Sequence, residues 1–177
     1  MSPRWRLVSA IGAAVGASVA VAACGGSSSQ TGVIQVGAVA PAYATTKLGG
    51  DSVSLAALRG KVVLLNVWAT WCHPCRAEIP AVQALHVKFR DQGLEVIGVS
   101  VDVGGMDDGI RSFMAEFQMT YSVWLDPDER VSAQFRTIGV PETFLIDRAG
   151  VLRWHKIGPI QHGDSTLAIA LSRALGT

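Results

Sequence analysis

Cysteine is scarce in this sequence, and neither positive nor negative charge is in excess. Of its 177 residues only three are cysteines, at positions 24, 72 and 75, and no second closely spaced pair exists. The four histidines are too scattered to complete a zinc site around the one pair, and three cysteines cannot build a disulfide-rich scaffold. The 15 basic and 14 acidic residues give a formal net charge of +1, which provides no electrostatic argument for nucleic acid as a partner.

Long hydrophobic runs are also missing, except near the N-terminus. Arg4 and Arg6 precede about sixteen small or apolar residues without a charge, slightly short for a membrane-spanning helix but typical of an export signal. The run ends in VAAC at 21–24, which resembles the lipobox of bacterial lipoproteins and implies cleavage before Cys24 and its acylation. An uncleaved anchor and ordinary cleavage near Ala23 remain the alternatives. We expect a signal peptide over 1–23, a Gly/Ser-rich tether over 24–36 and one folded domain over 37–177.

Cleavage at this point has two consequences for the domain. It removes two basic residues, so that 13 remain against 14 acidic ones and the net charge becomes about −1. It also places Cys72 and Cys75 outside the cytosol, where disulfides persist. With 49% of its residues hydrophobic, the chain can bury a core without a metal or a disulfide to stabilise it.

In the rest of the chain, continuous apolar runs typical of buried strands alternate with segments in which apolar residues recur at the spacing of a helix. Continuous apolar runs at 61–69 and 94–102 predict strands buried on both faces, and the spacing of Ile79, Val82, Leu85 and Phe89 predicts a helix from Cys72 to about Arg90 between them. This is a βαβ unit. A hairpin with its tip at 49–51 and a helical turn ending at Gly60 should precede it. Further elements are expected at 107–118 (helix), 121–125 (strand), 128–136 (helix), 142–147 and 151–157 (paired strands) and 164–175 (helix).

The cysteine pair stands where the first buried strand ends and the helix begins. Unpaired backbone N–H groups and the helix dipole at this point favour a thiolate, so we expect Cys72 to have a lowered pKa and to act as the nucleophile. Cys75 lies one turn further on the same side and can displace a bound partner, while Pro74 removes an N–H that the first turn does not use. A structural disulfide is the weaker alternative, because so small a ring gains little stability.

Two segments carry a resemblance to a known family. WATWCHPCRAEIP, 68–80, resembles the thioredoxin active site, with Trp71 before the first cysteine, and GVPETFLID, 139–147, resembles the cis-proline segment of that superfamily. About forty residues separate Asp102 from Pro141, more than in thioredoxin, and Asn66 replaces a buried aspartate. Both features resemble the TlpA/ResA/CcmG branch of exported, membrane-tethered thiol–disulfide oxidoreductases.

The resemblance implies a thioredoxin-like three-layer α/β sandwich, with a mixed central sheet, an N-terminal β-hairpin and an inserted helix and strand. It implies no cofactor beyond a redox-active Cys72–Cys75 disulfide. Partners would be proteins with reduced or oxidised cysteines, among them apocytochromes c, and a membrane donor of electrons. Pro141 is expected to be cis and, with Val140 and Trp71, to bind an extended substrate segment.

Three other residues near the motifs have two interpretations each, and a fourth has one. Glu142 is either a proton relay for Cys75, a role that Asn66 cannot fill, or a solvated charge at a strand edge. His73 either tunes the Cys72 thiolate or lies on the surface. Trp68 either floors the substrate groove or belongs to the core, which is commoner for a residue on a buried strand. Glu78 is expected to be a favourable charge in an early helical turn, without a catalytic role.

Three rival functions use similar residues. A peroxiredoxin site resembles Pro-x-x-x-Thr-x-x-Cys, and neither cysteine has that threonine and proline before it. A copper chaperone of the same fold would use both thiolates with His155 or His162, although such proteins resemble a Cys-x-x-x-Cys spacing. An oxidase that introduces disulfides into secreted proteins would use the same atoms as a reductase and differ in reduction potential.

Overall fold

A computed structural model describes residues 34–176 of the chain. Its helices and strands follow the order expected from the sequence. In chain order they are β1 (Ala44–Lys47), β2 (Ser52–Ser54), the 3-10 helix η1 (Leu55–Leu58), β3 (Val62–Trp68), α1 (His73–Phe89), the 3-10 helix η2 (Arg90–Gln92), β4 (Leu94–Ser100), α2 (Asp107–Glu116), β5 (Ser122–Leu125), α3 (Arg130–Phe135), β6 (Glu142–Ile146), β7 (Leu152–Ile157) and α4 (Ser165–Leu175).

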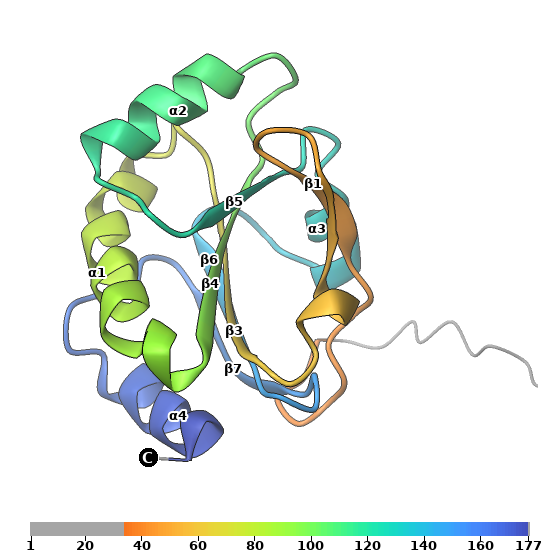
Figure 1. Cartoon of the computed structure of the whole chain (residues 1–177), viewed down its shortest axis with the longest axis vertical. Coiled ribbons are helices and arrows are strands. Elements are labelled where there is room, and N and C mark those ends of the chain that lie inside the picture. Colours follow the sequence, from red (N-terminus) through yellow and green to blue (C-terminus); the bar gives the residue numbers. More distant parts are fainter. Residues whose placement is uncertain (1–33, 177) are drawn as a thin grey trace, which may run out of the picture. The chain divides into compact units, whose positions relative to one another are not determined.

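The strands form one mixed sheet in the order β2-β1-β5-β4-β3-β6-β7. The three central strands β3, β4 and β5 are parallel, and the strands on either side of them run antiparallel to their neighbours. In Figure 1, α1, α2 and α4 lie on one side of this sheet and α3 on the other. The three-layer α/β class, the N-terminal hairpin and the inserted α2–β5 unit are therefore confirmed.

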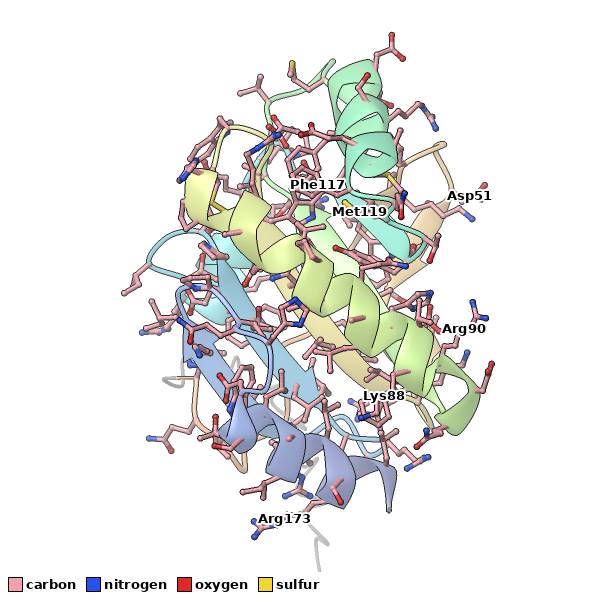
Figure 2. The ribbon with its side chains drawn as sticks, turned by 90° about the vertical axis from the view of Figure 1, so that its left-hand side faces the viewer. Asp51, Lys88, Arg90, Phe117, Met119 and Arg173 are labelled. Carbon is pink, nitrogen blue, oxygen red and sulfur yellow. A yellow bond between two sulfur atoms is a disulfide. The ribbon has the colours of Figure 1, made fainter. Side chains whose placement is uncertain are left out.

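Burial explains why the central strands form. Every residue of β3 is buried, since helices cover both faces of a sheet whose middle strands have no solvent side. α1 runs across one face between α2 and α4, as Figure 2 shows, and it continues through Pro80. Among residues 34–176 no helix is both long and apolar enough to cross a bilayer.

Candidate active site

The two predicted cysteines meet at the junction of β3 and α1. Cys72 and Cys75 form a disulfide, and both are buried, with 3% and 0% of their surfaces exposed. Cys72 is the N-cap of α1, and its Sγ lies 3.2 Å from the backbone nitrogen of Cys75, which donates to it. The sulfur therefore occupies the place of an N-cap oxygen, where unpaired N–H groups stabilise negative charge.

The turn that presents Cys72 is held by a carboxylate from the next strand. Asp102, two residues beyond β4, accepts from the backbone N–H of Thr70 (3.2 and 3.0 Å to its two oxygens) and from the Thr70 hydroxyl (2.6 Å). Ser100 adds its hydroxyl to the same carboxylate at 2.8 Å. These bonds fix the β3–α1 turn by contacts that are far apart in sequence, which is why the motif alone did not indicate Asp102.

The burial of Glu78 was not expected from the sequence. It is fully buried, not a charge on an exposed helical turn, because α1 turns this position toward the sheet one turn after Cys75. The Asn66 amide donates to Glu78 Oε1 at 2.7 Å and to the Thr143 hydroxyl at 2.9 Å. The asparagine thus positions a carboxylate supplied by the helix, whereas thioredoxin has a carboxylate at the strand position itself.

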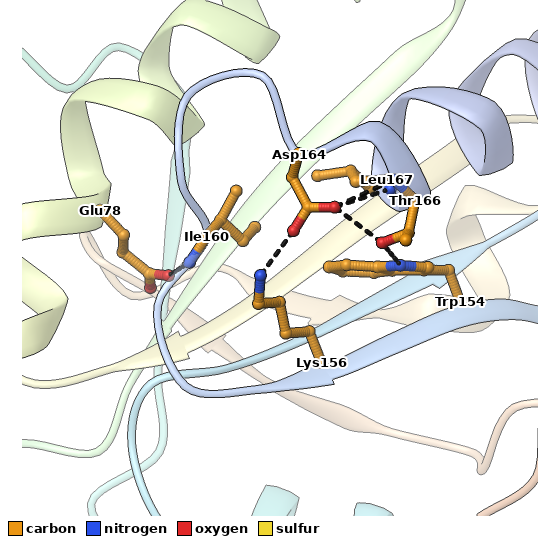
Figure 3. Close-up of polar contacts among 7 residues, drawn as sticks. All are labelled: Glu78, Trp154, Lys156, Ile160, Asp164, Thr166 and Leu167. Carbon is orange, nitrogen blue, oxygen red and sulfur yellow. Dashed lines mark hydrogen bonds and ion pairs between the residues drawn. The ribbon is translucent and has the colours of Figure 1, made fainter.

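The second oxygen of Glu78 is bound by the β7–α4 loop. The Ile160 backbone N–H donates to Oε2 at 2.7 Å, as Figure 3 shows. Burial raises the pKa of Glu78 to about 7, against the lowering effects of the Ile160 and Asn66 hydrogen bonds and of the Lys156 charge. A carboxyl group with this pKa can both accept and release a proton near neutrality.

The β7–α4 loop is also held at its C-terminal end. Asp164 caps α4 by accepting from the backbone N–H groups of Thr166 and Leu167, and its other oxygen binds the Lys156 ammonium at 2.5 Å. Figure 3 shows the Lys156 side chain reaching from β7 to Asp164. These contacts with β7 and α4 therefore fix the position of the loop that covers Glu78.

The predicted cis-proline segment enters the sheet beside the cysteines. The Val140–Pro141 peptide bond is cis, as the resemblance implied. Pro141 precedes β6, whose first residue, Glu142, pairs with Val67 near the end of β3. Trp71 and Ile138, each close in sequence to one of these segments, expose 69% and 78% of their surfaces, whereas Val140 is half-buried. Exposed apolar side chains are thus found in sequence next to both the cysteine motif and the cis-proline.

The position of Glu142 contradicts one of its two interpretations. It is buried, so it is not a solvated edge charge, because its carboxylate is bound by His155 Nε2 at 2.6 Å and by the Ile138 N–H at 3.0 Å. Thr143, the next residue, faces Asn66 and α1, so the alternation of a strand turns Glu142 to the opposite face. The structure therefore brings Glu78, not Glu142, to the face on which α1 carries Cys75.

The remaining predicted residues fall into an exposed and a buried group. His73 and Pro74 are exposed on the first turn of α1. Trp68 is fully buried and stacks on Phe113 of the inserted helix at 4.7 Å between ring centroids, so it belongs to the core. Within 34–176, no three His, Cys, Asp or Glu side chains are grouped to bind a metal. Cys24, the predicted lipidation site, and the signal and most of the tether lie outside the described residues.

Comparison with known proteins agrees with this geometry. Residues 36–155 match the model of the AhpC/TSA family. The chain is 32% identical over 117 residues to the thiol-disulfide oxidoreductase ResA of Bacillus thuringiensis, which is 66% of each protein and so just under two thirds of the relative's length. It is 33% identical over 126 residues to the thioredoxin-like protein YneN of Bacillus subtilis, covering 71% of this chain and 73% of YneN.

A solved structure extends the likeness over most of the chain. A candidate thiol:disulfide interchange protein DsbE from Chlorobium tepidum superposes with a TM-score of 0.73 at 30% identity, covering 81% of this chain and 99% of that one. The similarity therefore extends far beyond the cysteine motif.

Proposed function

Because the chain belongs to the AhpC/TSA family of thioredoxin-like proteins, we propose that it is a thiol–disulfide oxidoreductase that acts by mixed-disulfide exchange through Cys72 and Cys75. The observation that carries the proposal is the position of Cys72 Sγ as the N-cap of α1, with Cys75 buried directly behind it. The peroxidase alternative finds no support, since the threonine and proline that resemble a peroxide site are absent before either cysteine.

In the reducing direction the reaction has two exchange steps. The Cys72 thiolate attacks one sulfur of a substrate disulfide, forming a mixed disulfide and releasing the other sulfur as a thiolate. Cys75 then loses its proton and attacks Cys72 Sγ, so that the second substrate sulfur leaves as a thiolate and the Cys72–Cys75 bond forms. The substrate gains two electrons and the protein loses two, which a thiol donor must return before the next cycle.

Glu78 fits the role of proton acceptor for Cys75. Its carboxylate lies one helical turn beyond Cys75, on the buried side of α1, and has a pKa of about 7. Asn66 and Ile160 fix both of its oxygens, so the group is held in one orientation. A base buried with the thiol that it deprotonates needs no water at the sulfur, where water would compete with the substrate.

Substrate binding is assigned to the segment around the cis-proline. Pro141 has no N–H, and Val140 can pair through its backbone with an extended peptide whose disulfide reaches Cys72. Trp71, directly before Cys72, adds an exposed ring. His73 is retained as a modulator of the thiolate, since it is exposed in the first turn beside Cys72.

The activity is tested by reduction of a protein disulfide. Purified 24–177 protein, reduced and supplied with dithiothreitol, should accelerate the reduction of insulin disulfides. The Cys72→Ser variant should be inactive. Insulin reduction no faster than with dithiothreitol alone would contradict the proposal, and stoichiometric Cu(I) binding in its place would revive the copper chaperone. The location of His155, bound to Glu142 on the face opposite α1, does not favour that alternative.

For the direction of electron flow we propose a reductase, with oxidised cysteines such as those of apocytochrome c as substrate. The support is the likeness to ResA. Equilibration with glutathione or dithiothreitol gives the reduction potential: a value near that of thioredoxin, about −270 mV, is expected, whereas one near about −120 mV would favour the disulfide-introducing oxidase.

We further propose that the domain acts outside the cytoplasm, tethered through a lipid on Cys24. The support is the order of the first residues: two arginines, an apolar run, VAAC and a Gly/Ser stretch. In a bacterial host, the full chain should fractionate with membranes and incorporate labelled fatty acid, and Cys24→Ser should abolish both. Labelling that survives this substitution would contradict the anchor.

A further inference from the structure

A second group of polar side chains lies in the layer between the sheet and α1. Tyr121, just before β5, is 2% exposed, and its hydroxyl makes no hydrogen bond to any residue that the structure describes. The same holds for Trp68 Nε1, His86 Nδ1 and Asn66 Oδ1. Buried polar atoms without a protein partner are rare, and in native proteins they usually bind internal water or take part in function.

These atoms belong to neighbouring side chains. A Cβ at Gly98 of β4 would lie 2.7 Å from Trp68 Nε1 and 3.0 Å from Tyr121 Cε2, so both rings lie against this glycine. The Tyr121 ring meets His86 edge-on, with centroids 6.0 Å apart. Gly98 is also the β4 partner of Asn66, whose amide binds Glu78, so the Tyr121 ring lies beside the part of the sheet that holds Glu78. Burial, and secondarily the Glu78 charge, raise the pKa of Tyr121 well above its usual range, so its hydroxyl stays protonated.

Glu78 needs a route for the proton that it takes from Cys75. It is fully buried, and its two hydrogen-bond partners, the Asn66 amide and the Ile160 N–H, bind it through donors and cannot take a proton from it. Lys156, the nearby cation, is a donor as well and is bound to Asp164. A hydroxyl differs from all three because it accepts and donates at the same time.

We propose that Tyr121 and His86 form the route by which protons pass between Glu78 and solvent. The inference rests on the proposed function. The Tyr121 hydroxyl receives the Glu78 proton on an oxygen lone pair while its own proton moves to Nδ1 of His86, with internal water bridging these groups. Tyrosine remains neutral throughout, Glu78 regains its charge, and the imidazolium releases the proton to bulk water.

The surroundings of His86 suit the last step. His86 lies on α1 two turns after Glu78 and is half-buried, so its ring has an inner and an outer side. Partial burial and the Arg90 charge lower its pKa, although Glu95 opposes them. The ring is therefore neutral at pH 7 and can accept a proton at Nδ1. Figure 2 shows Arg90 projecting from the same end of α1.

Single-turnover kinetics test this route. Reduced 24–177 protein is mixed with a small disulfide, and formation of the Cys72–Cys75 bond is followed by tryptophan fluorescence, which Trp71 should report. We expect Tyr121→Phe and His86→Ala to slow the resolving step about tenfold. Added imidazole should restore the rate of His86→Ala, which leaves an accessible gap, but not that of Tyr121→Phe. The reduction potential of His86→Ala should be unchanged, because a route alters rates and not the equilibrium.

Two matched variants serve as controls. Tyr43→Phe makes the same change in a tyrosine that is equally buried but packs against Phe135 of α3, on the other face of the sheet. His162→Ala removes an exposed histidine from the β7–α4 loop. Both should resolve as fast as the wild type. If Tyr121→Phe and His86→Ala match these controls, or if imidazole fails to accelerate His86→Ala, the route is wrong. A wild-type protein that does not form the bond at all would instead contradict the proposed function.

Discussion

At the scale of single residues, the site depends on where one carboxylate is placed. Asn66 occupies a strand position at which thioredoxin has an acid, and the sequence left open whether Glu142 takes over as a proton relay or is a solvated charge at a strand edge. The structure places Glu78 beside Asn66, because α1 turns this side chain inward and Asn66 donates to it. Local charge patterning could not reveal this, since a glutamate in an early helical turn is ordinarily exposed and favourable.

Glu78 should make the stability of the oxidised protein depend on pH. Burial raises its folded-state pKa to about 7 from an ordinary value of 4.5, so between these values the folded protein binds more protons than the unfolded chain. The unfolding free energy therefore falls as pH rises through this window, by up to about 3 kcal/mol. Glu78→Gln should lose this decline. Urea titrations at pH 4.5, 6 and 8 measure it, and parallel profiles for the two proteins would show that Glu78 titrates normally.

Gly98 is a second residue whose identity is set by its neighbours. Its backbone lies against Trp68 and Tyr121, and an added methyl group would overlap both rings. Gly98→Ala should therefore destabilise the protein by about 1–3 kcal/mol, as overpacking does. Thermal unfolding measures the loss. Gly104→Ala, where the new Cβ meets nothing within 4 Å, is the control, and equal melting temperatures for the two variants would argue against close packing at Gly98.

At the scale of elements, the spacing of hydrophobic residues along the chain predicted nearly all of the helices and strands. The buried runs became β3 and β4, the hairpin tip fell between β1 and β2, and the helix at 128–136 is shorter, Arg130–Phe135. The spacing of hydrophobic residues could not predict which loop covers which residue. The β7–α4 loop lies over Glu78 through the Ile160 N–H, a backbone contact across 82 positions that leaves no trace in side-chain patterning.

The cap of α4 should control how well this loop is held. Asp164→Ala removes two N-cap hydrogen bonds and the Lys156 ion pair, and should cost about 1 kcal/mol of unfolding free energy. Asp164→Asn keeps a capping oxygen and should lose less. Because its hydrogen bonds lower the pKa of Asp164 to about 2, the difference between wild type and Asp164→Asn should shrink as pH falls from 4 toward 2. Guanidinium unfolding at pH 3 and 7 checks this, and a constant difference would contradict it.

The inserted α2 also joins the site through contacts that the sequence did not indicate. Arg76, directly after Cys75, places its guanidinium 5.1 and 4.8 Å from the ring centroids of Phe113 and Phe117 and pairs with Glu116. Trp68, at the end of β3, stacks on the same Phe113. The insertion therefore packs against the strand and the helix that carry the cysteines, and the family resemblance gave its presence but not this role.

At the scale of the whole molecule, a sheet buried on both faces carries one reactive junction. The helix N-terminus stabilises charge on Cys72, the sheet and the β7–α4 loop enclose Glu78 behind Cys75, and the cis-proline segment begins β6 beside them. The fold class and the cysteines could be predicted because each depends on local pattern. The proton acceptor and its cover depend on long-range contacts, and only the folded chain brings them together.

The most direct test of this account is capture of a substrate by one cysteine and not the other. Reduced Cys75→Ser and Cys72→Ser variants are mixed with a protein that contains a disulfide, quenched with acid, and examined by mass spectrometry for a covalent adduct. The account predicts a stable mixed disulfide through Cys72 in the Cys75→Ser variant and none in the Cys72→Ser variant. Adducts through Cys75 in the Cys72→Ser variant, or no adduct in either, would contradict the assignment of Cys72 as the attacking thiolate.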